Sequence, residues 1–131
     1  MSLLKIRIFS YSKGGSDFVI GIVQGMDQGR DIVYHSIQEG VTKYVGITNS
    51  LARRSAQQLA KRGITIEPLI QGLSRADARA VEQALIEIHG LSKNGGTLSN
   101  KINSIAKLNP RYASALERGR SLLIKNGYDG L

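Results

Sequence analysis

The sequence contains no cysteine among its 131 residues. Disulfide bonds, thiolate metal sites and a cysteine nucleophile are therefore excluded, and the composition suits a reducing compartment such as the cytoplasm. No uninterrupted apolar run approaches the roughly 18 residues that a membrane-spanning helix requires. The first ten residues interrupt their apolar stretch with lysine and lack a small-residue cleavage site, so we expect no signal peptide.

Acidic residues are also scarce. Ten Asp and Glu stand against 18 Lys and Arg, which gives a net charge of +8 and a pI near 10.1. The excess is uneven, because residues 1–52 carry five basic and four acidic residues and residues 53–131 carry thirteen and six. Such a concentration of positive charge indicates a polyanionic partner, and nucleic acid is favoured over a membrane surface. The alternative is that the charge only keeps the protein soluble.

The remaining composition is that of an ordinary globular domain, with 41% hydrophobic and 21% charged residues. The length suits one domain. Residues 1–30 contain two short apolar stretches around a Gly-Gly-Ser turn, and we expect either a hairpin or an N-terminal extension there. Residues 31–131 are expected to form the main domain.

The main domain is expected to begin with a hairpin, because β-rich segments at residues 32–37 and 43–47 flank a Gln-Glu-Gly turn. Asn49 or Ser50 can cap a first helix that runs to about residue 62 and stops at a glycine. An edge strand is expected over residues 64–70, which include a proline.

A second helix is expected over about residues 75–89, followed by glycine. Residues 98–108 are expected to be irregular or briefly helical. A last helix is expected to begin with Pro110 at its first position and to end near Lys125. This order predicts an α+β domain, with a small, three-stranded, mainly antiparallel sheet flanked by helices and a C-terminal helix.

An acidic residue lies on the apolar face of the second expected helix. At about 100° per residue, Ala78, Val81 and Leu85 form one stripe, and Glu82 falls about 40° from Ala78. Glu87 points about 180° away, into water. A carboxylate on a buried face is costly unless it meets a cation, a metal or hydrogen-bond donors. Glu82 is therefore either a ligand for a hard cation such as Mg²⁺ or the partner of an internal arginine.

The same reasoning separates two adjacent arginines on the first expected helix. If Leu51 and Leu59 mark its inner face, Arg54 lies about 60° from Leu51 and Arg53 about 160° away. Arg54 can then reach a site beside the sheet, where its planar guanidinium suits a phosphate. Arg53 is expected to lie in solvent.

Two tripeptides, Ile32-Val33-Tyr34 and Tyr44-Val45-Gly46, precede Arg54 and Glu82, and this series resembles the GIY-YIG nuclease family. The tyrosines are ten residues apart and Arg54 follows Gly46 by eight, as in the family pattern. The resemblance covers about residues 31–103, and residues 44–54 are its most specific part. Ile32 departs from the pattern, since the family has glycine at that position.

The resemblance implies an endonuclease dependent on Mg²⁺ or Mn²⁺, in which Glu82 holds the metal and Arg54 neutralises charge on the phosphate. Tyr34 or Tyr44 would orient or deprotonate the attacking water, after a nearby cation or the metal has lowered the pKa of its phenol. His35 faces the opposite side of its strand, which favours a structural or substrate-touching role over a catalytic one.

Further residues are implied to support the site. Gly46 belongs to the second tripeptide, and the family supplies an asparagine after the glutamate helix. Asn100 matches the Leu-x-Asn-Lys pattern, and Asn103 is the second candidate. Either asparagine can instead cap a turn.

Basic side chains of the helical part are expected to hold a nucleic-acid backbone electrostatically. Aromatic residues make up only 5% of the chain, and no aromatic platform is evident, so base-specific readout is not predicted. The candidates are Lys61, Arg62, Arg75, Arg79, Lys101, Arg111, Arg118 and Arg120.

Other functions and contexts stay open at this point. The chain is alternatively a non-catalytic nucleic-acid-binding module with a degenerate nuclease core, a nuclease that cuts RNA or tRNA rather than DNA, or an interaction protein whose charge is incidental. It also resembles the C-terminal nuclease domains of secreted bacterial toxins used in competition between bacteria. Such a domain would act in the cytoplasm of a target cell and be blocked by a cognate immunity protein. A free-standing repair, recombination or restriction nuclease is the other context.

Overall fold

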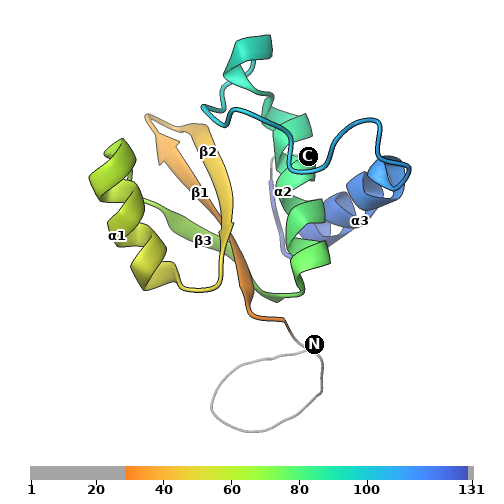
Figure 1. The fold of residues 1–131 in the computed structure, drawn as a ribbon, viewed down its shortest axis with the longest axis horizontal. Helices are drawn as coiled ribbons and strands as arrows, with labels where there is room; N and C mark the ends of the chain where they lie inside the picture. Colours follow the sequence, from red (N-terminus) through yellow and green to blue (C-terminus); the bar gives the residue numbers. More distant parts are fainter. Residues whose placement is uncertain (1–28, 130–131) are drawn as a thin grey trace, which may run out of the picture.

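A computed structural model describes residues 29–129, so the hairpin or extension expected within residues 1–30 lies outside the described part except for its last two residues. Figure 1 shows a small sheet with one helix on one side and two helices on the other. The elements follow in the order β1, β2, α1, β3, α2, a short 3₁₀ turn and α3. The α+β class expected from the sequence is confirmed.

The sheet is built on the expected hairpin. β1 (Asp31–Gln38) and β2 (Val41–Thr48) are antiparallel and joined by Glu39 and Gly40, both with positive φ (53° and 78°). This two-residue turn matches the right-handed twist of the strands. β3 (Glu67–Leu73) pairs antiparallel with the other side of β1, which gives the order β2-β1-β3.

β3 is an edge strand, as expected, but it lies three residues later than residues 64–70. Residues 64–66 are used to cross from the preceding helix to the sheet. The β1–β3 register is irregular next to Pro68, which pairs opposite Tyr34 and has no N–H to donate. A strand at the edge of a sheet tolerates this missing hydrogen-bond donor.

The helices begin and end largely where their capping residues predict. Ser50 accepts a hydrogen bond from the Arg53 amide at the start of α1 (Leu51–Arg62), and Gly63 ends it at φ 68°. Ser74 caps α2 (Arg75–His89). The predicted place of Pro110 is wrong, because α3 (Tyr112–Lys125) begins two residues later and Pro110 lies in the preceding turn. Residues 98–108 form no helix.

The core lies between one face of the sheet and the α2–α3 pair. Val33, Val45 and Ile70 from the three strands pack with the predicted stripe of α2, whose members Val81 and Leu85 are fully buried. Leu122 and Leu123 of α3 complete this cluster. None of the helices in the described residues is long and apolar enough to cross a bilayer.

The inner face of α1 differs from the prediction. Leu59 is 58% exposed, and Gln58 is the buried residue of this helix. The reason is that α1 lies on the side of the sheet opposite the core (Figure 1). Tyr34 and Tyr44 project on this side, where they contact Gln58 and Arg62 of α1. Gln58 and Arg54, four residues apart, therefore mark the inner face.

Candidate active site

A cavity of about 420 Å³ opens at the β2 edge of the sheet, between α1 and α2. It brings together residues that are far apart in the sequence, including all four predicted catalytic side chains. Its walls come from β1, β2, α1, α2 and the segment after α2. The lining residues are Tyr34, Tyr44, Gly46, Ile47, Arg54, Arg62, Arg75, Arg79, Glu82, Ser99, Asn100, Lys101, Ile102, Asn103 and Ser104.

The two tyrosines share one face of the hairpin. Tyr34 pairs with Gly46 and Ser36 pairs with Tyr44, so both rings project from the same side. Their ring centroids are 6.3 Å apart. A Cβ atom on Gly46 would lie 2.3 Å from the Tyr34 hydroxyl oxygen. The glycine of the second tripeptide is therefore required because the Tyr34 ring lies directly over it.

The Tyr34 hydroxyl is held inside the protein. Tyr34 is fully buried, and Gln58 Nε2 donates a hydrogen bond of 3.0 Å to its oxygen. Burial raises the pKa of Tyr34, and the hydrogen bond from Gln58 and the charge of Arg54 oppose this only in part. Without a bound metal, the neighbouring arginine therefore does not bring the pKa of Tyr34 below its ordinary value. Tyr34 is a neutral phenol at neutral pH.

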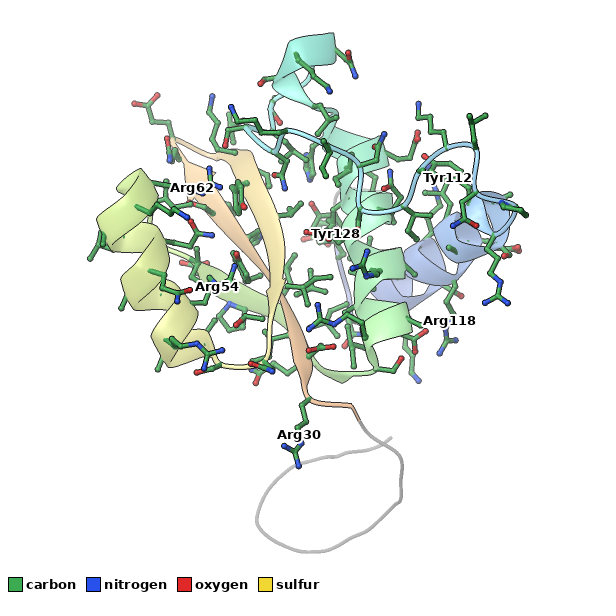
Figure 2. The ribbon with its side chains drawn as sticks, viewed as in Figure 1. Arg30, Arg54, Arg62, Tyr112, Arg118 and Tyr128 are labelled. Atoms are coloured by element: carbon green, nitrogen blue, oxygen red, sulfur yellow. The ribbon has the colours of Figure 1, made fainter. Side chains whose placement is uncertain are left out.

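Tyr44 lies in a different environment within the same cavity. It is half-buried, and the guanidinium carbon of Arg62 lies 4.8 Å from its ring centroid. This cation–π contact places a positive charge at the upper end of α1, on the sheet side (Figure 2).

Glu82 points into the cavity without an ion-pair partner. Within residues 29–129 no Lys, Arg or His lies within salt-bridge distance of it, which argues against the internal ion pair. Arg75 instead binds Asp31 with hydrogen bonds of 2.9 and 3.2 Å. Burial raises the pKa of Glu82, opposed by a hydrogen bond from Ser104 and by the charges of Arg79 and Arg75. Its carboxylate is available to a cation.

The two adjacent arginines point in different directions, as the helical phase predicts. Arg54 lines the cavity, and its Nε is buried with no hydrogen-bond partner among the described residues. Arg53 is exposed and donates to Asn49 Oδ1 at 3.1 Å. Arg54 is therefore the arginine that can bind a phosphate in the cavity.

The two asparagines have different tasks. Asn100 accepts from the Val45 amide at 3.1 Å and donates to the Val45 carbonyl at 2.8 Å, so its side chain acts as a strand partner for the edge of β2. Its amide is thus committed to the backbone. Asn103 accepts from Gln83 Nε2 at 3.0 Å, and its own Nδ2 has no partner within residues 29–129. Asn103 fits a ligand-binding role better than Asn100.

Sequence reasoning missed two buried glutamines. Gln83 is fully buried on α2 and fixes the wall of the cavity, since its Oε1 accepts from the Ile105 amide at 2.8 Å. Gln58 holds the Tyr34 hydroxyl. Gln83 lies about 140° from Ala78, outside the predicted apolar stripe, so the sequence contains no signal for its burial. Gln58 had no signal either, because the inner face of α1 was assigned to its leucines.

Several predicted residues lie away from the cavity. His35 faces the core side and lines a separate cavity of about 340 Å³ with Tyr128, and burial lowers its pKa. Glu87 is not free in water, because Tyr112 donates a hydrogen bond to it. Figure 2 shows Arg118 beyond α2, on the other side from Arg54. Lys61, Arg111, Arg118 and Arg120 do not line the cavity, and Arg118 is bound to Asp77 at 3.0 Å.

Comparison with family models, curated proteins and solved structures found no match. Among the described residues, no group of three or more His, Cys, Asp or Glu side chains is arranged to hold a metal.

Proposed function

We propose that the chain is a metal-dependent endonuclease of the GIY-YIG type that hydrolyses phosphodiester bonds, with DNA favoured over RNA. One observation carries the proposal. A single cavity holds Glu82 without an ion-pair partner together with Arg54 and the Tyr34–Tyr44 pair. A half-buried carboxylate without an ion-pair partner, beside an arginine whose buried Nε has no hydrogen-bond partner among the described residues, suits a bound cation and phosphate better than it suits stability.

The donor set fits Mg²⁺ or Mn²⁺. Mg²⁺ keeps several waters and is commonly held by only one or two carboxylates together with substrate phosphates. Glu82 supplies one carboxylate, so the lack of a three-residue ligand group does not conflict with this type of site. When bound, the ion would polarise a phosphate oxygen and stabilise the leaving oxygen.

The side chains of the chain itself bind and orient the reactants. Arg54 can direct its planar fork at two oxygens of the scissile phosphate and neutralise the charge that develops there. Tyr34, a neutral phenol, orients the attacking water through its hydroxyl. As the water oxygen bonds to phosphorus, the bond from phosphorus to the leaving sugar oxygen breaks. The attacking water releases a proton to solvent, and the leaving sugar oxygen takes one up from solvent. Asn103 lines the same cavity, and its Nδ2 would donate to a phosphate oxygen there.

Positive charge at the cavity holds the nucleic-acid strand. Arg62, Arg79 and Lys101 line the cavity, so phosphates on either side of the scissile bond can meet them there. Arg75 contributes less, because it is paired with Asp31. The basic residues of α3 are too far from the chemistry to act in this way and are expected to contribute only general attraction.

Incubation of the purified chain with plasmid DNA, genomic DNA and total tRNA tests the proposal. We expect cleavage with Mg²⁺ and none with EDTA, and the fastest cleavage on DNA. Binding that falls steeply with salt but without cleavage of any substrate would instead identify a nucleic-acid-binding module with an inactive core.

A further inference from the structure

Gln58 has a hydrogen-bonding pattern that packing does not explain. It is 4% exposed on a helix whose neighbouring Leu59 is 58% exposed. Its Nε2 donates to Tyr34, while its Oε1 is buried with no hydrogen-bond partner in the described part of the chain. A buried amide with one unsatisfied atom is destabilising, whereas an apolar side chain at this position would not be.

The direction of the hydrogen bond determines where the Tyr34 proton points. An N–H donated by Gln58 occupies one lone pair of the hydroxyl oxygen, so the hydroxyl cannot donate back to the same atom. Its own proton is then directed elsewhere. Tyr34 lines the cavity, where a water or phosphate oxygen would accept that proton.

The unsatisfied Oε1 has a matching donor one helical turn away. Arg54 lies four residues before Gln58 on the inner face of α1, and its Nε–H is likewise buried without a partner. An arginine side chain has hydrogen-bond donors and no acceptor. The Gln58 amide is therefore complementary to both neighbours when its Oε1 faces Arg54 and its Nε2 faces Tyr34.

We infer that Gln58 is a positioning residue for the proposed hydrolysis, which holds the Tyr34 hydroxyl with its proton directed into the cavity. This inference rests on the proposed function. The glutamine is thereby retained where an apolar residue would give a more stable helix.

Gln58→Met tests the inference, because methionine keeps the length of the side chain and removes the donated hydrogen bond. Gln57→Met, at the exposed neighbouring position, is the matched control. For Gln58→Met we expect kcat to fall on the order of 10²-fold with KM unchanged, since the reacting groups lose their alignment. The melting temperature should not fall. The control should cleave like the wild-type protein.

A second readout does not depend on cleavage. The protein is labelled with ¹³C at the tyrosine ζ carbon, and the Tyr34 signal in the NMR spectrum is assigned by its absence in Tyr34→Phe. This signal should shift in Gln58→Met and keep its position in Gln57→Met. Three results would each overturn the inference while leaving the nuclease proposal intact. These are an unshifted Tyr34 resonance, an unchanged kcat, and a loss of kcat accompanied by a higher KM and a lower melting temperature. A wild-type protein that cleaves nothing would overturn the proposed function itself, and the role of Gln58 in hydrolysis with it.

Discussion

Replacing Glu82 with glutamine should make the protein inactive and more stable at the same time. Glutamine keeps the size of the side chain and its ability to accept from Ser104, but it removes a charge that burial disfavours. An unpaired polar group buried in a protein costs about 1–3 kcal/mol. Because Glu82 is only partly buried, we expect the low end of that range, about 1 kcal/mol, or a rise in melting temperature of roughly 4–8 °C for a domain of this size.

The stability difference should depend on pH with a definite sign. Burial raises the pKa of Glu82, so the folded protein holds this proton more tightly than the unfolded chain does. Below the ordinary glutamate pKa of about 4.3, both states are protonated and the two proteins should be similarly stable. As the pH rises through the raised pKa, the wild-type protein loses that stabilisation. The advantage of Glu82→Gln should therefore appear above about pH 4 and grow as the pH rises through the raised pKa.

Magnesium should act in the opposite direction, on the wild-type protein alone. A ligand present at ten times its Kd stabilises the folded state by about 1.4 kcal/mol. Thermal unfolding with and without Mg²⁺, at about pH 4 and about pH 7, measures both effects, and Glu117→Gln on the exposed face of α3 is the control. A lower melting temperature for Glu82→Gln at neutral pH would refute this reasoning and identify Glu82 as part of an ion pair.

Three further predictions follow from the cavity. Arg54→Ala should reduce the rate of cleavage by about 10²–10³-fold in kinetic assays, whereas Arg53→Ala should change the affinity for nucleic acid only modestly. Equal losses of cleavage rate in the two variants would contradict the assignment of Arg54 to the inner face of α1. Tyr34→Phe should lose most activity with little change in melting temperature, and more than Tyr44→Phe; full turnover in both would exclude a hydroxyl role. Gly46→Ala should lower stability by about 1–3 kcal/mol in denaturant titrations, because its Cβ meets the Tyr34 hydroxyl oxygen at 2.3 Å; unaltered stability would show that the ring moves freely.

The parts of the fold that the sequence predicts are those specified by neighbouring residues. The Glu39-Gly40 turn, the Ser50 cap of α1 and the apolar stripe of α2 all depend on residues within one or two turns of each other. The direction of Glu82 into the cavity follows from that stripe. Local signals of this kind are therefore sufficient to predict the hairpin, helix α2 and the direction of the Glu82 side chain.

The rest depends on contacts between distant residues. Asn100 and Asn103 look equivalent in the sequence, and only the edge of β2, 55 residues away from Asn100, commits one of them to the backbone. The Arg118–Asp77 pair joins residues 41 positions apart. Leu59 is exposed because α1 covers the polar side of the sheet, which no pattern within α1 reveals.

Nicking of supercoiled plasmid by the purified chain tests the central claim most directly, with Glu82→Gln and Glu117→Gln compared at equal concentration. If Glu82 holds the metal in a nuclease site, the wild-type protein and Glu117→Gln should convert supercoiled plasmid to the open form only when Mg²⁺ or Mn²⁺ is present. Glu82→Gln should bind DNA but should not nick it. Nicking by Glu82→Gln at the wild-type rate, or no nicking by the wild-type protein with either metal, would contradict the account.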